Sequence, residues 1–225
     1  MSEVGFPAAG IGFLADLAAN NNRAWFKANA ARYREQFQQP AEALLQGLQN
    51  ELETHCGLAV SAKIFRLARD LRFAADKTPY HTYLRMGFYP WLQGRAPQQE
   101  QSPLGWYLSL EPHQLMLGCG RFVMPKTELE DYRHRLQGAE GDALARLTAR
   151  AVAQGCRQWE PELKQLPPGF PKDYPHPHLA RCKSISLWRD LAVPTWLHQP
   201  GAAARLAQEL AQFQPLWNWL QGAKA

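Results

Sequence analysis

Segment 66–80 concentrates side chains that could bind an anion, reading R-L-A-R-D-L-R-F-A-A-D-K-T-P-Y. Arg66, Arg69 and Arg72 recur at intervals of three, and Lys77 adds a fourth cation. A planar guanidinium group can form paired hydrogen bonds with a carboxylate or a phosphate. The residue types and their spacing therefore predict a site for a phosphate- or carboxylate-bearing ligand.

Two acids lie among these bases, and they leave two interpretations open. Asp70 and Asp76 could pair with the arginines and hold the loop in shape. Alternatively, some guanidinium groups remain free and converge on a ligand, while an acid orients an arginine that the ligand also contacts. The candidate ligand-binding residues are Arg66, Arg69, Arg72, Asp76, Lys77 and Tyr80.

Two residues of this region, Asp70 and His81, are candidate general bases. Asp70 could serve only if salt bridges do not consume its carboxylate. A histidine among arginines has its charged form disfavoured, which would make His81 a neutral base, although a structural loop histidine is the simpler interpretation.

Other motifs carry weaker signals. His176 and His178 each follow a proline, Pro175 and Pro177, with no further ligand nearby, so we expect no metal site there. Cys119 lies between Gly118 and Gly120, a pattern more typical of a turn or bulge than of a nucleophile or an anion-binding loop. Because the sequence contains no phosphate-binding loop, nucleophile elbow or zinc-protease motif, we expect no cofactor.

Composition favours a soluble, cytoplasmic protein with one domain, 1–225. The chain has 225 residues and a formal charge of +5, and segment 63–85 alone holds six bases and two acids, a formal charge of +4. Its four cysteines are scattered, which excludes a disulfide framework or structural zinc spacing. The first residues lack a basic region typical of a signal peptide, and no run of about 20 apolar residues occurs.

Hydrophobic periodicity predicts an α+β fold, with a mostly antiparallel sheet of about four to six strands flanked by N- and C-terminal helices. We expect a loop at 92–103, an irregular stretch at 166–178, and a helix start at Thr78-Pro79. Thr127 is the expected N-cap of a later helix, and Pro215 the expected kink of the last one. The predicted helices span 11–21, 23–38, 40–56, 127–136, 142–153 and 200–220. The predicted strands span 60–67, 83–91, 106–111, 114–119 and 183–191.

The charged segment also resembles the signature RxxRDxRF…DKxxY of a mainly bacterial family of unknown function, domain-of-unknown-function family 2461. The matching residues are Arg66, Arg69-Asp70, Arg72-Phe73, Asp76-Lys77 and Tyr80. Similar stretches elsewhere are Asn20-Asn21, Trp25-Phe26, Tyr107-Leu108, Leu110-Glu111-Pro112, Gly118, Gly120, Pro168-Gly169-Phe170 and Lys183-Ser184. The resemblance covers nearly the whole chain. It implies a fold and a focal site, and it brings no activity, substrate or cofactor.

Three functions follow as hypotheses. The first is a binding site for a small anionic ligand. The second is an enzyme, a hydrolase or transferase acting on such a ligand. The third is a module that binds nucleic acid or protein through a basic face, with the Arg/Asp network purely structural. We expect no membrane partner, and the sequence leaves the oligomeric state open.

Overall fold

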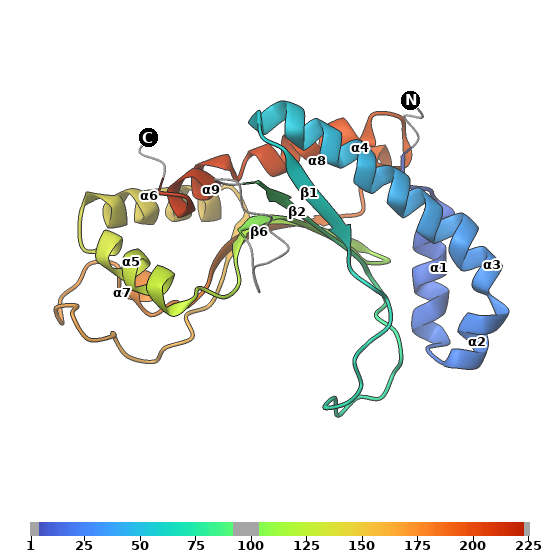
Figure 1. Ribbon diagram of the computed structural model, residues 1–225, viewed down its shortest axis with the longest axis horizontal. Coiled ribbons are helices and arrows are strands. Elements are labelled where there is room, and N and C mark those ends of the chain that lie inside the picture. The colour runs from blue at the N-terminus through green and yellow to red at the C-terminus, as the bar shows by residue number, and fades with distance from the viewer. Residues whose placement is uncertain (1–4, 92–103, 223–225) are drawn as a thin grey trace.

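An antiparallel sheet of six strands forms the centre of the molecule (Figure 1). The computed structural model describes residues 5–91 and 104–222, so the loop predicted at 92–103 lies outside the described residues. The spatial order of the strands is β1-β2-β3-β4-β6-β5. The strands are β1 (Val60–Ile64), β2 (Leu84–Pro90), β3 (Gly105–Leu110), β4 (Gln114–Arg121), β5 (Cys156–Gln158) and β6 (Ile185–Ala192).

Helices lie before, between and after these strands, which confirms the predicted α+β class. The N-terminal group is α1 (Ala8–Ala19), α2 (Arg23–Ala28), α3 (Ala30–Arg32), the π-helix η1 (Tyr33–Gln38) and α4 (Gln39–Cys56). The later elements are α5 (Lys126–Leu136), α6 (Ala139–Ala153), α7 (Pro177–Ala180), the 3-10 helix η3 (Thr195–His198), α8 (Ala202–Ala211) and α9 (Gln214–Leu220). Among the described residues, no helix has the length and apolar content needed to cross a membrane.

The core lies between one face of the sheet and the helices α4, α8 and α9, which cover it (Figure 1). Alternation along β3 directs Trp106, Leu108 and Leu110 to this face, and all three are buried. Trp106 stacks on Trp217 of α9 with ring centroids 5.4 Å apart. Burying side chains of this size supplies most of the driving force for folding. The sheet is thereby a rigid base for its connecting loops.

The single helix predicted over 23–38 is wrong in detail, because the chain passes through a short break and a π-helix and then continues directly into α4. Pro40 has no amide hydrogen, so it cannot bond the Gln36 carbonyl as an α-helical residue would. That carbonyl instead lies against Gly10 of α1, where an added Cβ would be 2.6 Å from the oxygen. The widened turn therefore coincides with a close approach of two helices.

Two further predictions about helix ends need correction. Thr127 is not the N-cap of α5, because Pro125 occupies that position and the helix begins at Lys126. Pro215 does more than kink the last helix: α8 ends at Ala211 and α9 begins at Gln214. The predicted hairpin of β3 and β4 is confirmed, whereas the short edge strand β5 was missed because its three residues carry no readable period.

Candidate functional site

The signature loop, residues 65–83, connects the antiparallel strands β1 and β2 and extends well beyond the sheet (Figure 1). Its two arms pair near the sheet through a bridge between Ala68 and Tyr80. The Arg69 amide donates to the Pro79 carbonyl at 2.9 Å, and the His81 amide donates to the Leu67 carbonyl at 2.7 Å. The arms therefore form a short antiparallel stem. The outer part of the loop extends beyond this stem.

This pairing corrects two local predictions. The first strand ends at Ile64, so Arg66 lies on the loop and not on the strand predicted to reach residue 67. No helix begins at Thr78-Pro79. The Thr78 hydroxyl and amide instead bond the Asp76 carboxylate, and Pro79 supplies a carbonyl to the stem. Hydrogen bonds to Asp76 and between the two arms of the loop therefore take the place of the helix cap that the sequence predicted.

Asn21 attaches the signature loop to the N-terminal helices. Its side-chain amide donates to the Tyr80 carbonyl at 2.9 Å, and its carbonyl accepts the Tyr80 amide at 3.1 Å. The Tyr80 ring also stacks on Phe26 of α2, with centroids 4.2 Å apart. Asn22, the neighbour of Asn21, caps α2 by accepting the Trp25 amide. These contacts bring the start of α2, and with it Arg23, to the loop.

Internal pairing is present for two of the three signature arginines. Arg72 forms a forked ion pair with Asp70, with its Nη2 2.7 Å from Oδ2 and its Nε 3.0 Å from Oδ1. Arg69 pairs with Asp76 at 2.5 Å and also donates to Thr78. Hydrogen bonds from Arg72 lower the pKa of Asp70. Hydrogen bonds from the Thr78 amide and from Arg69 lower the pKa of Asp76 to about 2.

Lys77 closes the outer part of the loop, because its ammonium donates to the Leu71 carbonyl at 3.0 Å. Asp76, Lys77 and Tyr80 therefore hold the loop in shape. None of these three lines the hollow described next. For them, the structural interpretation of the sequence pattern accounts for the contacts.

Four arginines surround a shallow hollow of about 360 Å³ beside the first arm of the loop. Its lining residues are Arg23, Arg66, Arg69, Asp70, Leu71 and Arg72. Four guanidinium groups against one carboxylate give the lining a formal charge of +3. Within residues 5–91 and 104–222, Arg23 and Arg66 form no salt bridge with an acidic side chain, and both are exposed. Arg66 contributes, less than Arg72 does, to the lowered pKa of Asp70. The hollow therefore retains positive charge that the loop's own acids do not neutralise.

Sequence reasoning missed Arg23, which comes from α2 and lies far from the signature in the chain. The sequence indicated Arg23 only indirectly, because the family-like pairs Asn20-Asn21 and Trp25-Phe26 lie on either side of it. Asn21 and Phe26 are the residues that contact Tyr80, so those two pairs attach α2 to the loop.

His81 lies beside the stem and not in the lining of the hollow. Its pKa is lowered, chiefly by burial and further by repulsion from Arg69, Arg85 and Arg66. Its ring lies 4.8 Å from that of Tyr83. The expected neutral imidazole is therefore favoured, and burial contributes more than the arginines do.

The weaker motifs lie elsewhere. Cys119 is fully buried in the core and its pKa is raised by burial, which is incompatible with a reactive thiolate. His176 bonds the Asp142 carboxylate at 2.8 Å. The described part of the chain contains no group of three or more histidine, cysteine or acidic side chains placed to hold a metal ion.

A family model described as a conserved hypothetical protein, DUF2461, matches residues 9–219. The chain belongs to the DUF2461 family. No curated protein matches the chain. The DUF2461 match includes α2, the whole signature loop and the sheet that supports it.

Proposed function

We propose that this protein binds a small phosphate- or carboxylate-bearing molecule in the hollow between Arg23 and the first arm of the signature loop. The observation that carries the proposal is the convergence of Arg23 and Arg66, two exposed arginines that form no salt bridge within the described residues, on one hollow lined by two further arginines. Arginine is suited to phosphates and carboxylates because its donors form a rigid fork.

The paired residues have a defined part in this proposal. Arg69 is held by Asp76 and Thr78, and only 21% of its side chain is exposed, so it offers a fixed guanidinium group. The Arg72 side chain is more accessible than that of Arg69, because 78% of it is exposed, and its ion-pair partner is Asp70. An incoming anion would compete with Asp70 for Arg72.

The expected affinity follows from the number of charged contacts. A hydrogen bond to a charged group contributes about 1.5–3 kcal/mol. Three such bonds would contribute about 4.5–9 kcal/mol, and the cost of association makes the net binding free energy smaller than this sum. Loss of one arginine should therefore weaken binding about tenfold or more.

The observations favour binding over catalysis. Asp70, the first candidate base, accepts several hydrogen bonds from Arg72, and its pKa is lowered accordingly. His81, the second, lies outside the lining of the hollow. A hydrolase or transferase would need a free base at the ligand; Asp70 lines the hollow but is paired with Arg72, and His81 lies outside the lining.

One observation favours nucleic acid as a second candidate ligand. Phe73 lies beside Arg72 in the outer part of the loop and is 96% exposed. Exposed aromatic rings among arginines are typical of surfaces that stack on unpaired bases. Binding of single-stranded oligonucleotides should then weaken with added salt and be lost in Phe73→Ala, whereas a small anion should bind Phe73→Ala normally.

The test is a thermal-shift screen of pyrophosphate, citrate, sugar phosphates and nucleotides on the wild type, Arg66→Gln and Arg23→Gln. Lys27→Gln, on the same helix as Arg23 but outside the hollow, is the matched control. We expect a stabilising ligand whose effect is lost in both arginine variants and kept in the control. Equal shifts in all four proteins would refute the proposed site.

A further inference from the structure

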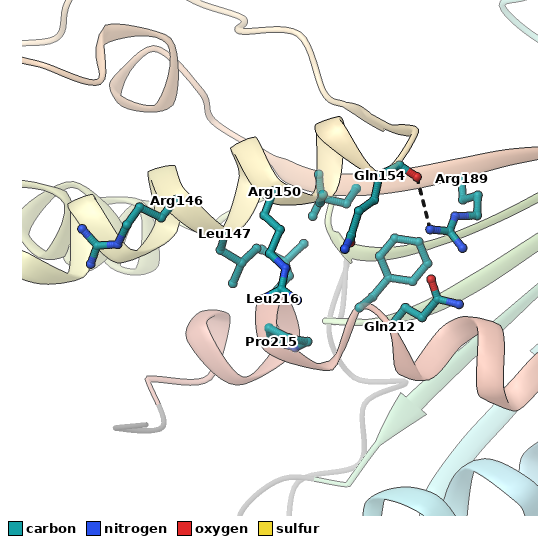
Figure 2. A pocket seen from close by; sticks show the side chains of 11 residues that line it. Arg146, Leu147, Arg150, Gln154, Arg189, Gln212, Pro215 and Leu216 are labelled. Atoms are coloured by element: carbon teal, nitrogen blue, oxygen red, sulfur yellow. Dashed lines mark hydrogen bonds between the residues drawn. The ribbon is translucent and has the colours of Figure 1, made fainter.

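A second and larger hollow, of about 730 Å³, lies between α6 and the joint of α8 and α9 (Figure 2). Its volume is within the range of about 300–1,000 Å³ that is usual for small-molecule pockets. The lining residues are spread over α6, β6, the α8–α9 joint and α9, and none belongs to the signature loop. This hollow is therefore a feature separate from the proposed anion site.

The α8–α9 joint borders this hollow. Pro215 lies at the first turn of α9, where its missing amide hydrogen costs nothing, but it could not continue α8. The chain therefore turns at Gln212 and Phe213, and Phe213 and Leu216 are buried beside the hollow. Leu187 of β6 also lines it. These buried side chains form the floor of the hollow, and its accessible apolar surface comes from Leu147, Ala151 and Pro215.

The charged groups of this hollow are all cations. Arg146, Arg150 and Arg189 line it, and no acidic residue does. Arg189 is already paired with Glu209 at 3.3 Å and donates to the Gln154 carbonyl. Within the described ranges, Arg146 and Arg150 have no acidic partner.

The two unpaired arginines differ in direction, although they lie one helical turn apart on α6. In Figure 2, Arg150 extends toward Pro215 and Leu216, whereas Arg146 points away from the other labelled side chains. The side chain of Gln212 donates to Glu209 at 3.0 Å, so its nitrogen is occupied. Arg150 is thus the cation placed over the apolar surface, and Arg146 is an internal comparison.

We propose that this hollow binds an amphipathic organic anion, with its apolar body on Leu147, Ala151 and Pro215 and its anionic head at Arg150. An apolar lining with one well-placed cation matches how pockets recognise such molecules: the body supplies affinity and the charge fixes orientation. Arg150 also lies in the last turn of α6, where a positive charge stabilises the helix. Its removal must therefore be judged by ligand binding and by thermal stability together.

The experiment is isothermal titration calorimetry of the full chain with octanoate. 1-Octanol tests the contribution of the apolar body alone, and acetate tests that of the anionic head alone. We expect octanoate to bind more tightly than either. Arg150→Gln should weaken octanoate about tenfold or more, since one charge-assisted contact is lost. Arg146→Gln, which removes the same charge from the same helix, should leave the affinity within about threefold.

Two further variants keep the test decisive. Ala151→Phe places a ring in the hollow without changing its charge and should abolish octanoate binding in a protein that still unfolds cooperatively. Arg66→Gln should leave octanoate binding unchanged, which separates this site from the signature loop. Any of four results would overturn the proposal. These are no binding of octanoate, equally tight binding of 1-octanol, an equal loss of octanoate affinity in Arg150→Gln and Arg146→Gln, and a loss of octanoate affinity in Arg66→Gln.

Discussion

Replacing Asn21 with alanine should detach the signature loop from the N-terminal helices. The Asn21 side chain makes two half-buried hydrogen bonds to Tyr80, at 2.9 and 3.1 Å, and alanine makes neither. Each such bond contributes about 0.5–1.5 kcal/mol, so we expect a loss of about 2 kcal/mol in the free energy of unfolding. For a chain of this size, that corresponds to a decrease of about 4–8 °C in melting temperature.

The assay compares Asn21→Ala with Asn20→Ala by denaturant unfolding and by hydrogen exchange. Asn20 is the matched control, because its exposed side chain bonds only the Asp16 carbonyl of its own helix. Exchange of the Tyr80 amide, which donates to Asn21, should accelerate about 30-fold in Asn21→Ala, the equivalent of about 2 kcal/mol. The control should leave that amide unchanged.

Detachment should also weaken anion binding, although Asn21 does not line the hollow. Without the attachment to Tyr80, Arg23 on α2 is no longer held beside Arg66 on the loop. The reasoning is refuted if Asn21→Ala is no less stable than Asn20→Ala, if the Tyr80 amide exchanges at the wild-type rate, and if ligand affinity is unaltered.

Two more predictions concern the charges of the loop. Asp70→Asn keeps an acceptor for the Arg72 amide and removes the negative charge that competes with the ligand. Titration calorimetry should therefore show that pyrophosphate binds about two- to fivefold more tightly. Weaker binding would contradict the proposed competition. The Asp76 carboxyl should titrate near pH 2 by NMR, since its pKa is about 2 against 3.8 unperturbed. Because that pKa is lowered on folding, the stability that Asp76 contributes is complete above about pH 4 and is lost as the pH falls toward 2. An unshifted pKa for the Asp76 carboxyl would contradict its hydrogen bonds to Thr78 and Arg69.

A further pH prediction concerns His81, whose pKa should lie below 6.5 in the folded protein. The unfolded chain then binds more protons in this range, so the contribution of His81 makes the protein more stable as the pH rises toward 6.5. Saturating pyrophosphate should raise this pKa by offsetting the nearby arginines, measured on the imidazole resonances. An unchanged pKa on ligand addition would place the anion away from Arg66 and Arg69.

The sequence was most informative where burial decides structure. The apolar stripe of Leu44, Leu48 and Leu52 indicated α4, and all three are buried in the core. The alternating pattern of β3 and β4 likewise located a hairpin that the sheet contains. Periodicity works at these positions because the same side chains that make the pattern bury the most apolar surface.

The sequence was less informative where distant residues compete with local signals. Thr78-Pro79 has the composition of a helix start, yet the Asn21–Tyr80 bonds and the stem bridge hold this stretch extended. Arg23 could not be assigned to the site, since only the folded chain brings α2 to the loop. The sequence gives the number of charges in the signature, but it does not show which arginines are already paired with acidic side chains.

A double-mutant cycle at Arg23 and Arg66 tests the central claim most directly, with pyrophosphate as the probe and calorimetric affinity as the readout. If both guanidinium groups contact one anion, each single change to glutamine should weaken binding about tenfold or more, and the two effects should be non-additive by about 0.5 kcal/mol or more. Strictly additive effects would place the two arginines at separate sites. Wild-type affinity in the double variant would contradict the account outright.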